Sequence, residues 1–332
     1  MNAWIELSYL IASSLFIIGL KYLGSPLTAR RGNFLASFAM LLAIVATLLD
    51  QNIVNYQMIL IAILIGSVIG VVSAKLVKMT AMPQMVGLFN GFGGIASALV
   101  SIAELFRLMR LDGPIAVETS SIIVLGLLIG GVTFTGSVVA FGKLQGWVRG
   151  APITFKFQQV FNGFLVLCFV VGSFYLTFSD TNFWVFLGLI FISFLFGVLF
   201  VIPIGGADMP VVISFLNSFS GLAACVTGFL VMNNVLIISG ALVGASGLIL
   251  TQIMCKAMNR SLANVLFGAF GGGGTAGGSE GAALGDKTVR SIDTEEAATI
   301  LAYAKSVIIV PGYGMAAAQA QHAVQSLVQE LE

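Results

Sequence analysis

Two asparagines in apolar segments, with an aspartate near one of them, are the residues of this sequence best placed to form a polar pathway. Asp208 precedes Met209-Pro210, a dipeptide suited to starting a helix, and Asn217 follows nine residues after the acid. Asn90 lies seven residues after Pro83, just as Asn217 lies seven residues after its own proline. At about 1.5 Å per residue, each amide is roughly 10 Å inside a helix. That depth approaches the centre of a hydrocarbon layer about 30 Å thick.

The two asparagines belong to an internal repeat with a constant offset of 127 residues. The amides at matching depth either form a paired polar pathway, or they hydrogen-bond neighbouring helices and only hold a bundle together. The sequence alone leaves both interpretations open. The matching positions are Met82-Pro83 with Met209-Pro210, Asn90 with Asn217, Phe92 with Phe219, Gly94 with Gly221, and Gly70 with Gly197.

The composition indicates a protein embedded in a lipid bilayer. Of the 332 residues, 58% are hydrophobic and 9% are charged, and the mean hydropathy is +1.04. Because a water-facing surface needs far more charge, these values exclude a soluble domain. No basic run interleaves with aromatic residues, so we expect no nucleic-acid partner. We expect neither a disulfide nor a metal site, because the three cysteines lack ligand spacing: Cys168, Cys225 and Cys255.

Nine apolar runs are long enough, or nearly so, to cross a bilayer. Backbone groups must be satisfied inside lipid, and the alternating strands of a closed barrel are absent from this sequence. The predicted fold class is therefore an all-α polytopic membrane protein, with the beginning of an α/β domain at the C-terminus. The expected spans are 4–22, 34–49, 57–74, 84–105, 120–141, 158–178, 183–203, 209–231 and 235–255.

The distribution of Lys and Arg predicts the orientation of these spans. With the N-terminus outside, ten Lys and Arg residues fall in inner loops or just after the last span, and two fall in outer loops. Since cytoplasmic loops carry the excess of Lys and Arg, everything after residue 256 is expected in the cytosol, or in the matrix if the membrane is mitochondrial. The inner residues are Lys21, Arg30, Arg31, Lys75, Lys78, Lys143, Arg149, Lys156, Lys256 and Arg260, and the outer ones are Arg107 and Arg110.

Few other polar residues interrupt the spans, so each of them is informative. The hydroxyls of Thr133, Thr135 and Ser137 are expected to bond carbonyls of their own helix. Ser246 lies within Gly244-Ala-Ser-Gly247, where small residues allow a neighbouring helix to approach closely. No span carries a histidine, and the single histidine of the chain, His322, is expected at a surface.

The C-terminal quarter of the chain has a different character. Residues 259–293 form a predicted linker that is rich in glycine. Thr294-Glu-Glu then has the threonine cap and the first-turn acids of a helix start. The β-branched run 306–310 predicts a short buried strand. Gly312-x-Gly314-x-x-Ala317 follows it, and Ala316 to Leu331 is expected to be helical.

A strand, this glycine pattern and a helix make the first unit of a dinucleotide-binding fold. The first glycine makes the tight turn, the second lets the backbone approach a pyrophosphate, and the helix N-terminus supplies N–H groups. The alternative is a glycine-rich turn without a ligand. Because such a fold needs more strands and helices than residues 294–332 provide, we expect an incomplete domain that binds a dinucleotide negligibly by itself.

Several stretches are long enough to indicate a family. They are Ser25–Asn33, the two Met-Pro repeats with their asparagines, Gly240–Gly247, Met254–Ser261 and Val310–Gln321. Together they resemble the beta subunit of the proton-translocating NAD(P) transhydrogenases, and the resemblance runs along the whole chain. It implies a membrane domain at residues 1–258 and an NADP(H)-binding domain that begins at 294. It also implies a partner alpha subunit with the NAD(H) domain, a homodimer of alpha-beta units, and a bacterial inner membrane.

The resemblance assigns expected roles to individual residues. Asp208, Asn217, Asn90 and Ser246 would lie on the proton pathway, with Asn217 facing Asn90 or Ser246 across the bundle. Gly247, Lys256 and Arg260 would couple the bundle to the nucleotide domain. NADP(H) would meet Gly312, Tyr313, Gly314, Met315, Ala316 and Ala317.

The sequence departs from the family pattern in two respects, and two alternative functions are open. Some members have a histidine where this chain has Asn90, so an imidazole in the pump would come from the partner subunit. With an incomplete nucleotide domain, the polypeptide is expected to be inactive alone. A nucleotide-regulated transporter or channel would also fit the repeat and the amides, and so would a structural subunit that holds a partner enzyme. The matching stretches favour the transhydrogenase.

The topology is open to a direct test. A cysteine introduced at Ser279 should react with a membrane-impermeant thiol reagent only from the cytosolic side, because ten of twelve Lys and Arg residues mark that side. Labelling of this cysteine only from the outer side would refute the orientation.

Overall fold

The protein is all-helical in the part that the computed structural model describes, which is residues 3–49, 56–111, 115–178, 182–267, 293–312, 315 and 320–331. Within these residues, nine helices are long and apolar enough to cross a membrane. The nine predicted spans are thus confirmed, and the chain is an integral membrane protein. The nine are α1 (Ala3–Leu23), α2 (Pro26–Leu48), α3 (Tyr56–Leu76), α4 (Met82–Met109), α5 (Val117–Leu144), α6 (Gln158–Phe178), α7 (Phe183–Val201), α8 (Met209–Leu230) and α9 (Asn234–Ala257).

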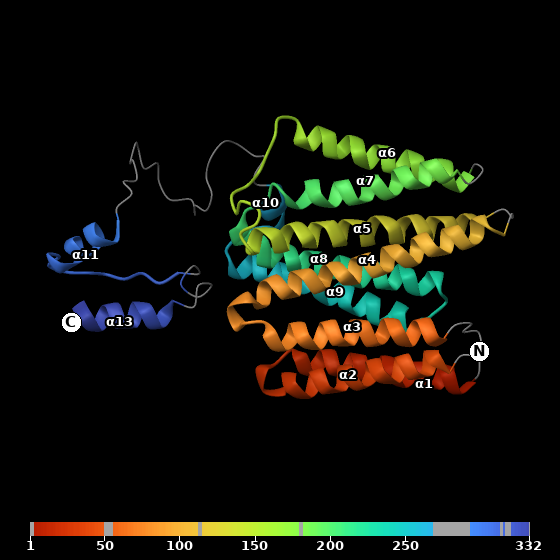
Figure 1. The fold of residues 1–332 in the computed structure, drawn as a ribbon, viewed down its shortest axis with the longest axis horizontal. Coiled ribbons are helices and arrows are strands. Elements are labelled where there is room, and N and C mark those ends of the chain that lie inside the picture. Colours follow the sequence, from red (N-terminus) through yellow and green to blue (C-terminus); the bar gives the residue numbers. More distant parts are fainter. Residues whose placement is uncertain are drawn as a thin grey trace. The chain divides into compact units, whose positions relative to one another are not determined.

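The chain divides into two compact units. The first comprises Met1–Val77 and Pro83–Gly273, and its long helices run alongside one another (Figure 1). A 3-10 turn at Gly206–Asp208 leads into α8, and the short helix α10 (Leu262–Phe267) follows α9. The second unit comprises Lys78–Met82 and Gly274–Glu332, and contains a 3-10 turn at Met79–Ala81 with helices α11 (Thr294–Ala302) and α13 (Gln321–Leu331).

Helix α2 begins eight residues before the predicted start of the second span, at Pro26 rather than at residue 34. Proline at the first helical position is favourable, because its missing N–H would have no partner there. The extra turns carry Arg30 and Arg31. Charged residues lower hydropathy but do not break a helix, so the hydropathy pattern marks the apolar part of α2 and not its whole length.

Glycines bring the helices of the first unit into backbone contact. A Cβ on Gly130 in α5 would lie 2.7 Å from the carbonyl oxygen of Gly94 in α4. A Cβ on Gly247 in α9 would lie 2.9 Å from the Cα of Ser218 in α8. The close approach expected around Gly244–Gly247 is therefore confirmed. These contacts fix α4 against α5, and α8 against α9, at distances that larger residues cannot reach.

Buried apolar side chains fill the space between the helices at both ends of α5. One cluster joins the C-terminal half of α5 to α7, α8 and α9, and it includes Val201, Val212, Leu216 and Cys255. Val265 of α10 belongs to the same cluster, with 3% of its surface exposed. Part of the segment predicted as a linker from residue 259 is therefore packed against the bundle. The second cluster includes Leu105, Leu127, Phe169 and Phe186.

The second unit differs in two details from what the sequence predicted. Asp293, and not Thr294, caps α11, because its Oδ1 accepts a hydrogen bond of 2.8 Å from the backbone N–H of Glu296. The run 306–310 forms no strand within the described residues, and its side chains are exposed. Val307 and Ile309 are 38% exposed, and Ile308 and Val310 are 85% exposed, so the side chains alternate as in an extended chain. The predicted burial is not observed, because an extended run is buried only when neighbouring strands or helices cover both of its faces.

The glycine contacts predict opposite effects of the same substitution at two positions. Gly130→Ala should destabilise the protein by about 1–3 kcal/mol, because the added methyl overpacks against the α4 backbone. Gly70→Ala should be neutral or stabilising by up to about 1 kcal/mol, since a Cβ on Gly70 would meet no atom within 4 Å and alanine favours a helix. Thermal unfolding of both purified variants measures the difference, and equal midpoints would contradict the packing described here.

Candidate functional site

A hydrogen-bonded polar cluster joins three helices of the first unit. Asn90 of α4 is buried, and its Nδ2 donates to Ser137 Oγ of α5 at 2.9 Å. Ser220 of α8 donates to Asn90 Oδ1 at 2.7 Å. A buried amide with partners for both its donor and its acceptor is stable in an apolar surrounding. This cluster therefore links α4, α5 and α8 at the depth predicted for Asn90.

Asn217, the counterpart of Asn90 in the repeat, is placed differently. Its side chain is half-buried on α8, one turn before Ser220, and it forms no hydrogen bond with the described residues. Asn217 thus retains free donors and acceptors, whereas Asn90 uses its own to hold helices together. The expected pairing of Asn217 with Asn90 is not among the hydrogen bonds formed, because Ser220 takes that place.

Closer to the start of α8, a second polar contact connects α8 with α9. The hydroxyl of Thr251 donates to Gly247 O of its own helix at 2.8 Å and lies 3.1 Å from Ser214 Oγ. Both side chains are buried. Polar groups therefore recur along α8 at positions 214, 217 and 220, about one turn apart, with Ser214 facing α9 and Ser220 facing α4.

An ion pair lies at the start of α8. Arg260 Nη1 lies 2.6 Å from Asp208 Oδ2, and the side chains are 31% and 12% exposed. Asp208 ends the 3-10 turn before α8, where the positive end of the helix dipole favours a carboxylate. Arg260 follows a tight turn after α9, in which Asn259 has a φ of 52°. The pair therefore ties the entrance of α8 to the segment that leaves the last span.

Neighbouring backbone contacts hold the segment that carries Asp208. Lys143, at the end of α5, donates from Nζ to the carbonyl oxygens of Ile202 and Ile204, both at 2.6 Å. Gly206 N donates to Gly150 O at 2.7 Å. A buried ammonium on carbonyls just after the end of α7 satisfies groups that a helix end otherwise leaves unpaired. The loop between α7 and α8 is thus held in place just before Asp208.

The remaining predicted residues lie in various surroundings. Ser246 is exposed and donates to Val243 O of its own helix, so the structure does not bring it into the polar cluster. Gly247 packs against Ser218, and Lys256 is exposed. Gly312 and Met315 are joined by a 3.1 Å hydrogen bond from Met315 N. Positions 279, 313, 314, 316 and 317 lie outside the described residues.

The sequence reasoning missed several members of the site. Thr133 and Thr135 bond carbonyls of their own helix, as expected, but Ser137 accepts a hydrogen bond from Asn90. Ser220 was not singled out, although its spacing of three residues from Asn217 places it on the same helix face. Lys143 was counted only as a charge for orientation, and its burial depends on where α7 ends.

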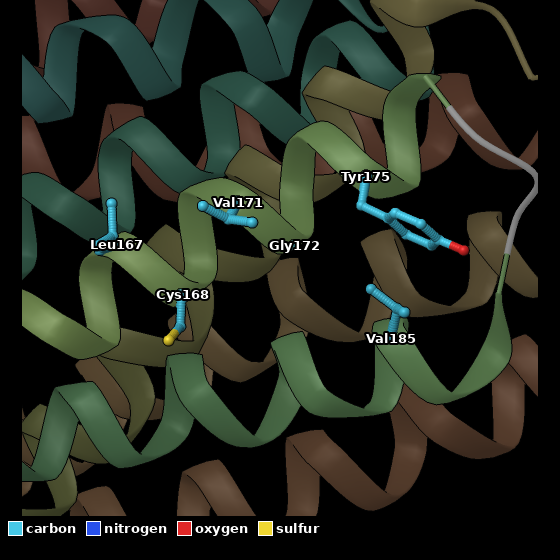
Figure 2. A pocket seen from close by; sticks show the side chains of 6 residues that line it. All are labelled: Leu167, Cys168, Val171, Gly172, Tyr175 and Val185. Atoms are coloured by element: carbon cyan, nitrogen blue, oxygen red, sulfur yellow. The ribbon is translucent and has the colours of Figure 1, made fainter.

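The described residues offer no other obvious chemistry. No group of three or more His, Cys, Asp or Glu side chains is placed to hold a metal ion in the described segments. A pocket of about 440 Å³ lies between α6 and α7, with Cys168, Gly172, Tyr175 and Val185 in its lining (Figure 2). Apart from the tyrosine hydroxyl its lining is apolar, which suits hydrocarbon rather than a proton or a nucleotide.

Comparison with known proteins gives one consistent result. The family model described as NAD(P) transhydrogenase beta subunit matches residues 5–332. Two curated relatives, both described as NAD(P) transhydrogenase subunit beta from Rhodospirillum rubrum, are 46% identical to this chain over 331 residues. The aligned region covers 98% of this chain and 70% of each relative.

Proposed function

Because this chain belongs to the NAD(P) transhydrogenase beta subunit family, we propose that it is the membrane subunit of an enzyme coupling hydride transfer to proton movement. Hydride passes between NAD(H) and NADP(H). A beta subunit implies an alpha subunit as its partner, and we assign the NAD(H) site to that partner. We also infer a homodimer of alpha-beta units in a bacterial inner membrane. The family match does not favour the alternative of a nucleotide-regulated transporter or channel.

The single observation that supports this function best is the row of polar groups along α8. It starts at the Asp208–Arg260 ion pair and continues through Ser214 and Asn217 to Ser220 with Asn90. Polar residues are costly inside a membrane and commonly mark ion or proton routes. Asp208 exchanges protons with water at the entrance, and Asn217 orients water with its unpaired amide. Asn90 cannot titrate and holds the three helices in register.

The ion pair gives the membrane unit a means of coupling. A carboxylate that binds a proton loses its charge and most of its attraction to a guanidinium. Protonation of Asp208 therefore releases Arg260, which lies in the segment leading from α9 toward the C-terminal part of the chain. Lys256 lies at the last turn of α9, four residues before Arg260, and we assign it to the same coupling segment. Gly247 lets α9 lie directly on α8 at Ser218, so a shift of one helix is transmitted to the other.

The C-terminal segment is the proposed NADP(H) site. A Cβ on Gly312 would meet no atom within 4 Å, which leaves room for a phosphate to approach the backbone. Residues 312–317 would hold the pyrophosphate with backbone N–H groups. Bound nicotinamide nucleotides supply the hydride donor and acceptor. The proposed domains are a membrane domain at 1–258, a linker at 259–293 whose first part, α10, packs against the bundle, and the start of a Rossmann-like domain at 294–332.

The proposed orientation has the N-terminus outside and the C-terminal segment in the cytosol. Helices α5, α7 and α9 end, and α6 and α8 begin, at the same end of the bundle (Figure 1). Lys143, Arg149, Lys156, Lys256 and Arg260 lie at that end, in agreement with the rule that positive residues gather on the cytosolic side. Asp208 is then the cytosolic mouth of the pathway.

The test of this function is the Asn217→Leu variant in the enzyme assembled with its partner subunit. Because Asn217 forms no hydrogen bond with the described residues, assembly and thermal stability should change little. Proton uptake and hydride transfer should fall together by about tenfold or more, and both are measured in proteoliposomes. The matched control is Gln252→Leu, which removes an exposed amide from α9 and should retain both activities. Near-normal coupled activity of Asn217→Leu would remove Asn217 from the pathway.

A further inference from the structure

A polar face of α4 continues outward from Asn90 toward the other end of the bundle. Ser97, Ser101 and Glu104 follow Asn90 by seven, eleven and fourteen residues, a spacing that keeps all four on one side of a helix. Ser97 and Ser101 are buried, with 7% and 0% of their surfaces exposed. The hydroxyl of Ser97 has no hydrogen-bond partner among the described residues, whereas Ser101 donates to Ser97 O at 3.3 Å.

Helix α8 contributes a buried hydroxyl without a partner at the same level. Thr227 lies seven residues after Ser220, hence on the face of α8 that meets Asn90, and it is 6% exposed. Its Oγ1 is buried and bonds no described atom. Thr133, Thr135 and Thr251 all donate to a carbonyl of their own helix. Thr227 does not, so its hydroxyl needs an external partner to offset the cost of burial.

A glycine of α5 lets the three helices approach one another closely at this level. A Cβ on Gly126 would collide with Ser101 Oγ and would lie 3.5 Å from Val226 Cγ1, the residue next to Thr227. The three helices therefore meet here around small side chains and hydroxyls. A buried water molecule requires space and several polar partners, and Ser97, Ser101 and Thr227 are suitable partners from two helices.

The polar face of α4 ends at an acid, Glu104, near the outer end of the helix. The side chain of Glu104 is 22% exposed and forms a 2.5 Å ion pair with Arg107, which is 62% exposed. Glu104 lies one turn beyond Ser101 on the same face. The other charged residues of the described segments at this end are Glu6 of α1, Arg110 after α4 and Glu118 of α5. Glu104 is thus the partly buried carboxylate between the hydroxyl row and water.

We propose that Ser97, Ser101, Thr227 and Glu104 form the outer half of the proton pathway, a water-filled seam between α4, α5 and α8 that joins the Asn90 cluster to the outer surface. The seam rests on the proposed function. A proton from outer water binds the Glu104 carboxylate and leaves it for a water molecule held by Thr227 and Ser97. That water passes one of its own protons inward, toward Ser220 and Asn90, so each carrier accepts one proton and releases one.

Thr227→Val and Glu104→Gln test the seam in the assembled enzyme. Valine keeps the shape of threonine and removes the hydroxyl, and glutamine keeps the shape of glutamate and cannot ionise. Both variants should slow proton uptake and hydride transfer by about tenfold or more. Thr227→Ser, which keeps the hydroxyl, and Glu104→Asp, which keeps the carboxylate, should recover most of the rate. In Thr227→Val, turnover should also be slowed more by D₂O than in the parent enzyme, because proton transfer becomes limiting.

Two controls separate transport from packing. Thr135→Val removes a hydroxyl of α5 that bonds only its own helix, and Arg107→Gln breaks the ion pair while leaving the carboxylate. Thr135→Val should retain the parent rates, whereas Arg107→Gln should retain proton uptake that Glu104→Gln loses, because the carboxylate is still present. Parent rates in Thr227→Val and Glu104→Gln, or a Thr227→Ser variant as slow as Thr227→Val, would overturn the seam. Hydride transfer by the parent enzyme without any proton uptake would instead overturn the proposed function itself.

Discussion

Hydrocarbon offers no hydrogen bonds, and this constraint explains the arrangement of polar side chains in the membrane unit. A buried polar group in such a medium must find its partner within the protein or in water that the protein holds. Asn90 finds Ser137 and Ser220, Thr251 approaches Ser214, and Asp208 finds Arg260. All of these contacts involve α8 or its direct neighbours. Helix α8, which begins directly after the 3-10 turn at Asp208, therefore carries or adjoins these buried polar groups.

The two copies of the internal repeat are similar in sequence, but their corresponding residues make different contacts. Gly94 and Gly221 both bring a neighbouring backbone close, to α5 and α9 respectively. Their asparagines have diverged, because Asn90 is fully hydrogen-bonded while Asn217 is half-buried and unbonded. Gly70 and Gly197 also differ, since only Gly197 is in tight contact, with Val132 and Thr135 of α5. Equal spacing in the sequence thus placed the two asparagines at corresponding positions of α4 and α8, and the packing around them decided which amide remained available for water.

Much of the fold could be predicted from the sequence, because hydropathy alone identifies helices that must cross a lipid layer. The start of α2 and the cap of α11 were misplaced, since both depend on local backbone geometry that hydropathy does not record. Of the site, the depths of Asp208, Asn90 and Asn217 were predictable from their distance to Met-Pro. The partners Arg260, Ser220 and Ser137 were not, because they come from residues distant in sequence whose rotation toward one another is set by glycine contacts. Ser246 was expected near the pathway and is exposed, since Gly244 and Gly247 take the face of α9 that meets α8.

The proposed proton pathway depends on Asp208 being the cytosolic proton-exchanging group of this bundle. The most direct measurement is hydride transfer by the assembled enzyme in vesicles under an imposed pH difference, with Asp208→Asn compared with the parent. Asparagine still accepts a hydrogen bond from Arg260 but cannot bind and release a proton. The pH difference should accelerate hydride transfer in the parent enzyme and leave the rate of Asp208→Asn unchanged. Equal acceleration of the two enzymes would show that protons cross the membrane without passing Asp208, and would contradict the account.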